Sequence, residues 1–155
     1  MKDSAQDKTQ DKDLEILESR LKSYREGRID PVTRIYWEIH YGINLGFAIG
    51  NTRVEDAVLD VGCGAGRTLI DLAKAGRKCY GVDPLWEISL CKAQENAREL
   101  GVEIGLARSQ GENLPFKDGQ FNMVLLLSTL QHVTNQEKTL TEIVRVLKRD
   151  GMLLV

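Results

Sequence analysis

The chain has 155 residues, of which 42% are hydrophobic, and a formal net charge of −2. A chain of this length and composition can bury the core of one domain, and its slightly acidic balance is atypical of proteins that hold nucleic-acid backbone. The three cysteines lack C-x-x-C spacing and make an odd count, so we interpret them as reduced thiols of a cytoplasmic protein. The polar start of the chain predicts no signal peptide, and the longest apolar run, 123–127, is too short to cross a bilayer.

The first fifty residues predict a polar tail followed by two helices. Residues 1–12 have little to bury, so we expect them to be disordered. Apolar residues from Leu14 to Tyr24 recur at helical spacing, and Pro31 suits the start of a second helix. Three glycines lie four residues apart near the end of that helix: Gly42, Gly46 and Gly50. Glycine is unfavourable inside a helix, so either the helix frays there or another segment packs closely against it.

Strands and helices alternate from residue 57 onward. The apolar runs predict five strands, at 57–61, 78–82, 103–107, 121–127 and 151–155. Helices are predicted at 67–75 and at 86–100, with Trp86 on the buried face of the second. A third helix begins near Thr134, which has capping-box spacing to Glu137. This order predicts an α/β fold with a doubly wound parallel sheet and helices on both faces.

The segment Val58–Gly66 joins the first predicted strand to the first helix of this alternation. Asp60 precedes a loop with glycine at every second position, Gly62, Gly64 and Gly66. Glycines let a strand turn sharply and let a ligand approach bare backbone, and a helix start offers unpaired N–H groups. In a doubly wound sheet this loop lies beyond the carboxyl ends of the strands, where strand order reverses. The segment therefore predicts a site for a nucleotide-type ligand.

Asp83, at the end of the second predicted strand, indicates that the ligand contains a nucleoside. An acid at this place can bond two ribose hydroxyls, in dinucleotide sites and in methyl-donor sites alike. Two residues separate these options. A dinucleotide fingerprint expects a small residue where Arg67 stands, and Asp60 would repel a pyrophosphate. The same carboxylate would favour a ligand that carries an ammonium and a sulfonium.

Residues 57–155 resemble the class I S-adenosylmethionine-dependent methyltransferases of the ubiquinone/menaquinone-type, small-molecule group. The segments that carry the resemblance follow in the family's order: Val58–Gly66, Tyr80–Pro84, Glu112–Phe116 with Phe121–Val124, Leu130–Val133 and Leu147–Gly151. The resemblance implies a Rossmann-like sheet over 51–155, with S-adenosylmethionine as cofactor and a small molecule as methyl acceptor. It also implies that 13–50 forms a helical lid over the substrate; packing of its aromatic residues onto the sheet is the alternative.

The resemblance also assigns residues to parts of the cofactor. Asp60 and the loop residues Gly62, Cys63 and Gly64 would hold the methionine part, and Asp83 would bind the ribose hydroxyls. The residues implied around the adenine are Pro84, Leu85, Gln110, Gly111 and Glu112. The residues implied beside the sulfonium are Leu127 and Ser128.

The chain departs from the family pattern at three places. Gln110 stands where Asp often accepts a bond from the adenine amino group, and the Gln amide oxygen can still accept it. Asn122 replaces a common Asp, which we interpret as structural. The family sheet has seven strands, whereas this chain ends within the fifth, so that 152–155 would form an open apolar edge for pairing with a second copy. We favour a shortened version of a longer protein; an internal break and a short chain that dimerises are the alternatives.

Methyl transfer from a sulfonium is an in-line displacement in which the protein mainly aligns the reactants. His132, after the fourth strand, is the candidate catalytic base; a hydrogen bond to a loop carbonyl is its alternative, structural role. We predict no metal site, no nucleic-acid partner and no membrane partner. We therefore interpret the chain as a methyltransferase. The alternatives are a non-catalytic cofactor-binding or interaction module and a nicotinamide-dependent oxidoreductase.

Overall fold

The computed structural model describes residues 31–155. The tail predicted for 1–12 and the helix predicted from Leu14 lie outside the described residues. The chain divides into two compact units, 1–42 and 43–155. The helix predicted after Pro31 is present as α2, Pro31–Gly50, and every strand and every other helix described belongs to the second unit.

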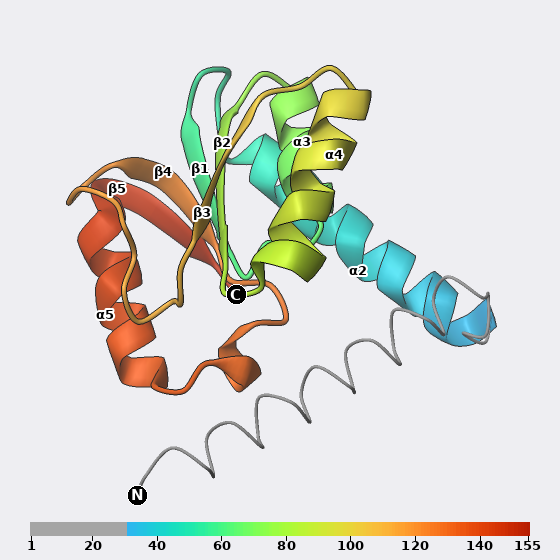
Figure 1. Cartoon of the computed structure of the whole chain (residues 1–155). Coiled ribbons are helices and arrows are strands. Elements are labelled where there is room, and N and C mark those ends of the chain that lie inside the picture. The colour runs from blue at the N-terminus through green and yellow to red at the C-terminus, as the bar shows by residue number, and fades with distance from the viewer. Residues whose placement is uncertain (1–30) are drawn as a thin grey trace, which may run out of the picture. The chain divides into compact units, whose positions relative to one another are not determined.

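Five parallel strands make up the sheet of the second unit (Figure 1). In chain order they are β1 Ala57–Val61, β2 Lys78–Asp83, β3 Ile104–Arg108, β4 Phe121–Leu125 and β5 Leu147–Leu154. Their order across the sheet is β3-β2-β1-β4-β5, so β1 lies between β2 and β4. The chain runs outward from β1 to β3 and then returns to place β4 on the other side of β1. The predicted doubly wound sheet is confirmed, with its switch point at β1.

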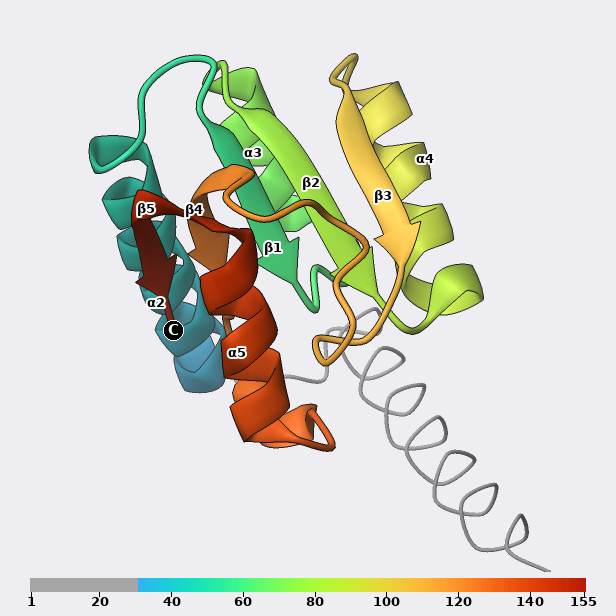
Figure 2. The same ribbon diagram turned by 90° about the vertical axis from the view of Figure 1, so that its left-hand side faces the viewer.

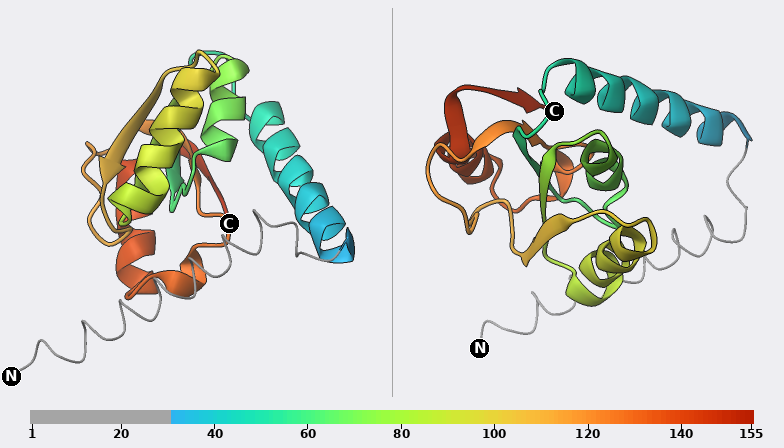
Figure 3. Two further views of the ribbon diagram at one scale, coloured as in Figure 1. Left: turned by 45° about the vertical axis from the view of Figure 1, so that its right-hand side comes forward. Right: turned by 90° about the horizontal axis from the view of Figure 1, so that it is seen from above.

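Helices cover both faces of this sheet. They are α3 Arg67–Lys74, α4 Cys91–Glu99 and α5 Gln136–Val146. Figures 2 and 3 show α3 and α4 on one face and α5 on the other. Residues of a strand alternate between the faces, so Val58 packs in one core with Leu69 and its neighbour Leu59 packs in the other with Ile143. Among residues 31–155, no helix has the length and hydropathy of a membrane-spanning segment.

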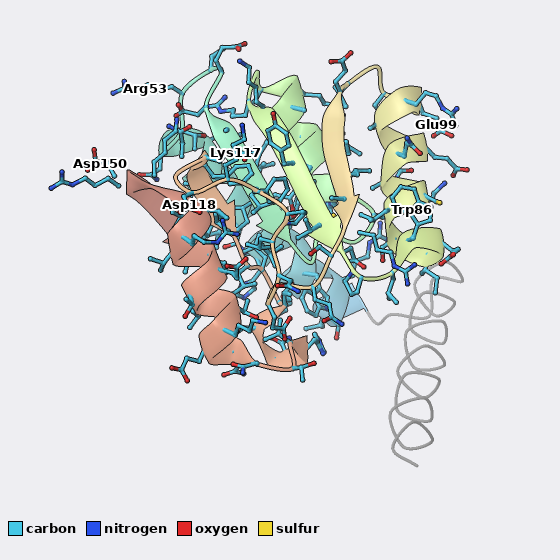
Figure 4. The ribbon with its side chains drawn as sticks, turned by 60° about the vertical axis from the view of Figure 1, so that its left-hand side comes forward. Arg53, Trp86, Glu99, Lys117, Asp118 and Asp150 are labelled. Carbon is cyan, nitrogen blue, oxygen red and sulfur yellow. The ribbon has the colours of Figure 1, made fainter. Side chains whose placement is uncertain are left out.

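The helical segment after β2 begins with a π-helical turn, Trp86–Leu90, and continues as α4. The Leu90 amide donates to the Leu85 carbonyl, five residues back, at 3.3 Å. A π turn holds more residues than an α turn, so Trp86 is rotated away from the buried face on which Leu90 lies. Trp86 is 38% exposed, whereas Leu90 is fully buried (Figure 4). The prediction of Trp86 as a core residue is therefore wrong.

The N-terminus of α5 is capped by Asn135 and not by Thr134. The Asn135 side-chain oxygen accepts the Lys138 amide at 2.9 Å, which satisfies one of the free N–H groups of the first turn. Thr134 lies one position too early for this bond, since the helix itself begins at Gln136.

β5 begins earlier than predicted, because the chain passes from α5 into the strand without a loop. Leu147 pairs with Phe121 of β4, and a register shift precedes the pairing of Met152 with Met123. β5 is the last strand in the order of the sheet. On this edge Met152 is 37% exposed and Val155, which follows the strand, is 63% exposed.

The end of α2 is fixed by a side chain from the segment before β2. The Arg77 guanidinium donates through Nη2 to the Ile49 carbonyl at 2.9 Å and to the Thr52 carbonyl at 2.7 Å. A cation at this place satisfies carbonyls that the last helical turn leaves free. The helix continues to Gly50, and no described atom lies within 4 Å of a Cβ placed on Gly46. Neither fraying nor close packing thus explains that glycine.

Candidate functional site

The glycine loop, residues 62–66, follows β1 at the carboxyl edge of the sheet. Gly62, Gly64 and Gly66 have φ values of 79°, 52° and 77°, a region that favours glycine. A Cβ on Gly62 would also lie 2.6 Å from Cγ2 of Thr129, in the turn after β4. Gly62 is therefore required both for its backbone conformation and for the close approach of that turn.

The amides of the glycine loop, apart from that of Ala65, donate to other described residues. Gly62 and Cys63 donate to the Val82 carbonyl at 2.8 and 3.1 Å, and Gly64 donates to the Asp83 carboxylate at 3.1 Å. The Gly62 carbonyl accepts no hydrogen bond from the described residues, so it remains as a backbone acceptor. Burial raises the pKa of the Cys63 thiol, which agrees with its interpretation as a small loop residue and not a nucleophile.

Asp83 ends β2 and connects the glycine loop to the residues that follow the strand. One carboxylate oxygen accepts the Gly64 amide at 3.1 Å, and the other accepts the Leu85 amide at 2.9 Å. The carboxylate is buried, whereas Pro84 is exposed and Leu85 is half-buried. Each carboxylate oxygen keeps a second acceptor position, so Asp83 can also bond the hydroxyl groups of a ligand.

Asp60 lies near the end of β1, paired with Gly81 of β2 and Leu125 of β4. Its side chain is buried, and no hydrogen bond from the described residues reaches the carboxylate. Burial, and secondarily the negative charge of Asp83, raise the pKa of Asp60 from 3.8 to about 7. A buried carboxylate without an internal donor is stabilised by a positive charge on a ligand.

Residues 109–120 connect β3 to β4 without a helix or strand of their own, and they carry three of the predicted residues. Gln110 is exposed, whereas Gly111 and Glu112 are buried. The amides of Gly111 and Glu112 donate to no acceptor among residues 31–155. The Ser109 amide donates to the Asp83 carbonyl at 3.3 Å. Two N–H groups without partners among the described residues therefore lie two and three positions after Ser109, which is bonded to Asp83.

The turn after β4 carries the remaining predicted residues. Leu127 is half-buried, and Ser128 is exposed with φ 54°, which is unusual for a residue with a side chain. The Thr129 hydroxyl donates to the Leu127 carbonyl at 3.0 Å. His132 ends a 3-10 turn, Leu130–His132, and is exposed; its ring makes no hydrogen bond to the described residues.

Hydrogen bonds and packing thus connect the four segments that carry the predicted site residues: the glycine loop, the end of β2, the 109–120 segment and the turn after β4. Asp83 is bonded to both the glycine loop and the start of the 109–120 segment, and Gly62 packs against the turn after β4. Thr129, which makes this last contact, was not predicted from the sequence. Glu142 and Arg145 of α5, which bind the 109–120 segment, were not predicted either; the one signal of this pair is its i,i+3 spacing on a helix.

Residues 59–155 match the protein family described as Methyltransferase domain. The match takes in the glycine loop, Asp83, the 109–120 segment and α5. The chain belongs to the class I S-adenosylmethionine-dependent methyltransferases. S-adenosylmethionine is the cofactor of this methyltransferase family, and the sheet of this chain has the family's Rossmann-like fold.

Three relatives of the methyltransferase show the extent of the match. YcgJ of Bacillus subtilis, described as an uncharacterized methyltransferase, is 35% identical over 117 residues, or 74% of this chain and 46% of YcgJ. Its crystal structure matches with a TM-score of 0.67 and 34% identity over 72% of this chain and 50% of that one. Norajmaline N-methyltransferase of Rauvolfia serpentina is 39% identical over 57% of this chain and 31% of its own. Ubiquinone biosynthesis O-methyltransferase of Maricaulis maris is 33% identical over 63% of this chain and 38% of its own length. The chain thus spans at most about half the length of these relatives.

Proposed function

We propose that this methyltransferase binds S-adenosylmethionine at the carboxyl ends of β1, β2 and β4 and transfers its methyl group to a small-molecule acceptor. The observation that carries the proposal is the Asp83 carboxylate. It holds the glycine loop through Gly64 and keeps acceptor positions for two hydroxyl groups. A nucleoside with a free ribose suits this arrangement, and the family match favours a methyl donor over a dinucleotide.

The methionine part of the cofactor is assigned to the end of β1. Its ammonium group would donate to the free Gly62 carbonyl, and the Asp60 carboxylate supplies the opposite charge in a buried place. Cys63 is the small, buried residue between two glycines of this loop, and Leu127 and Ser128 would flank the sulfonium from the turn after β4.

The adenine is assigned to the ends of β2 and β3. Pro84 and Leu85 supply apolar surface for one face of the base, and Gln110 can accept a bond from its amino group. The free amides of Gly111 and Glu112 are donors for the ring nitrogens on the same edge. The assignment is supported by the bond between Ser109 and Asp83, which keeps this segment beside the ribose position.

Transfer of the methyl group needs an acceptor atom in line with the sulfonium, and well-oriented pairs reach effective molarities of about 10⁵–10⁸ M. A base is required only where the acceptor must lose a proton. We assign that role to His132, because its ring is exposed and makes no hydrogen bond to any residue of 31–155.

The His132→Gln variant tests this role once an acceptor is known. We expect kcat to fall by about 10²-fold or more, with the affinity for S-adenosylhomocysteine unchanged, because the side chain lies outside the proposed cofactor contacts. An unchanged kcat across the pH range would show that His132 is not the base.

The decisive experiment for the proposed function is calorimetric titration of the chain with S-adenosylmethionine, S-adenosylhomocysteine and, as control, NADH. We expect micromolar binding of the first two alone, after which small-molecule acceptors are screened for methylation. Binding of NADH alone would support the oxidoreductase alternative. Cofactor binding without turnover on any acceptor would support a non-catalytic module.

We also propose that the chain acts in the cytoplasm, since its cysteines are free thiols, and that a second copy pairs along the open edge of β5. Exposed apolar residues at that edge, Met152 and Val155, favour such pairing. Sedimentation velocity at tens of micromolar should show a dimer that the edge variant Leu153→Pro removes; a monomer at that concentration would contradict the pairing.

A further inference from the structure

The 109–120 segment has no regular structure, yet it must hold two free amides and Gln110 in place. A segment without its own ladder of hydrogen bonds is ordered only by what it touches. In this chain it lies along α5 (Figure 2), and side chains of α5 supply the bonds that the segment lacks.

The C-terminal half of α5 binds the segment through one ion pair. The Arg145 guanidinium donates through Nε and Nη2 to the two carboxylate oxygens of Glu142, at 2.7 and 2.8 Å. The same Glu142 carboxylate accepts the Leu114 amide at 2.9 Å, and Arg145 Nη2 donates to the Leu114 carbonyl at 3.0 Å. Both polar groups of the Leu114 backbone are therefore satisfied by this pair.

Arg145 also reaches further along the segment. Its Nη1 donates to the Phe116 carbonyl and to the Asp118 carboxylate, each at 2.8 Å, and its own carbonyl accepts the Gly119 amide at 2.9 Å. The planar fork of a guanidinium suits this use, because it directs several donors at fixed angles. Figure 4 shows Asp118 beside α5. Hydrogen bonding to Arg145 lowers the pKa of Glu142, so the pair is ionised at neutral pH.

The N-terminal end of α5 holds the part of the segment that faces the proposed adenine. The Glu112 carboxylate accepts the amide of Asn135, the capping residue of α5, at 2.8 Å. Gly111 packs so closely on Thr139 that a Cβ would lie 2.8 Å from its Cγ2. The segment is thus fixed to α5 at both ends, by Glu112 and by the Glu142–Arg145 pair.

We propose that Arg145 and Glu142 are positioning residues for recognition of the base: they set the place of the Gly111 and Glu112 amides without contacting the ligand. Gln110 can turn its amide to suit either an amino or an oxo group on the base, but a backbone N–H held in place can only donate. Selectivity for adenine over hypoxanthine, whose N1 carries a proton, would therefore depend on how firmly α5 holds the segment. This inference rests on the proposed function.

The test compares binding of S-adenosylhomocysteine and of S-inosylhomocysteine, which has hypoxanthine in place of adenine, by calorimetry. The variants are Arg145→Met and Arg145→Lys, and the control is Arg149→Met, which removes an exposed cation that makes no bond to the described residues. We expect Arg145→Met to weaken binding of S-adenosylhomocysteine at least fivefold and of S-inosylhomocysteine less, so that the ratio of the two affinities falls. Arg145→Lys should be intermediate, and Arg149→Met should behave as the unsubstituted chain.

Hydrogen exchange keeps the test decisive where a variant is less stable. The Leu114 amide, which donates to Glu142, should exchange faster in Arg145→Met than in Arg149→Met, while the amides of β1 are unchanged. The inference would be overturned if, in Arg145→Met with unchanged exchange in β1, the ratio of the affinities for S-adenosylhomocysteine and S-inosylhomocysteine equals that of the unsubstituted chain. Failure of the unsubstituted chain to bind S-adenosylhomocysteine would instead overturn the proposed function, and this inference with it.

Discussion

Replacing Asp83 with alanine is expected to weaken binding of S-adenosylhomocysteine at least about fivefold, or by more than about 1 kcal/mol. Two losses combine in this variant. The ribose hydroxyls lose a charged acceptor, and the amides of Gly64 and Leu85 lose the carboxylate that fixes them. Because the second loss loosens the glycine loop, we expect the methionine part of the ligand to be held less firmly as well.

Calorimetric titration of matched variants separates these two losses. Asp83→Asn keeps one acceptor oxygen but not the charge, so it should fall between the alanine variant and the original chain. Asp150→Ala removes an exposed carboxylate of β5 and serves as control (Figure 4). Equal affinities for Asp83→Ala and the original chain would show that the ribose does not bind at the end of β2.

The affinity for S-adenosylmethionine is expected to rise with pH through neutrality, because the Asp60 carboxylate must be ionised to attract the ligand's positive charges. Its pKa of about 7 makes it mostly protonated at pH 6 and mostly ionised at pH 8, which corresponds to roughly a tenfold gain in affinity. Asp60→Asn should lose this part of the pH dependence. The ligand's own amino group titrates in the same way with both proteins. The difference in the slope of affinity against pH between the original chain and Asp60→Asn therefore measures the contribution of Asp60. Equal slopes for the two proteins would contradict the assignment.

The stability of the unbound chain should change with pH in the opposite direction. The pKa of Asp60 is higher in the folded chain than its ordinary value of 3.8, so the folded chain binds more protons between the two values. Its contribution to the free energy of unfolding is therefore complete below about pH 4 and is lost as the pH rises to about 7. Urea denaturation at pH 5 and pH 8 measures this decline, which Asp60→Asn should reduce.

Features encoded by short stretches of the chain were predictable from the sequence. β1 has the predicted bounds, Ala57–Val61, because a run of apolar residues between a polar stretch and a glycine loop leaves little freedom. The predicted structural role of Asn122 is confirmed: its side-chain oxygen accepts the Ala57 amide at 3.0 Å and the Lys148 ammonium at 2.9 Å. The places of Asp60 and Asp83 followed from strand ends in the same way.

Two kinds of feature could not be predicted: departures from the regular helical period and contacts between distant segments. The π turn at Trp86 changes the helical period, which apolar spacing assumes to be that of an α-helix, so the exposure of Trp86 was missed. The role of Arg145 was equally hidden, because its partners Leu114 and Phe116 contribute backbone carbonyls, which are the same for every residue type. The β-to-α alternation therefore predicted which edge of the sheet carries the glycine loop and Asp83, but not which helix holds the neighbouring 109–120 segment in place.

The central position of β1 also sets the order in which the parts of this sheet can form. The Ala57 amide bonds to Asn122, 65 positions further along the chain. Contacts of such separation form late, because closing a long loop costs entropy before any contact compensates for it. The proposed cofactor site needs both neighbours of β1, since Asp83 ends β2 and Thr129 follows β4. The proposed site would thus be completed only after this late pairing, so a ligand bound there would stabilise the finished sheet without guiding its assembly.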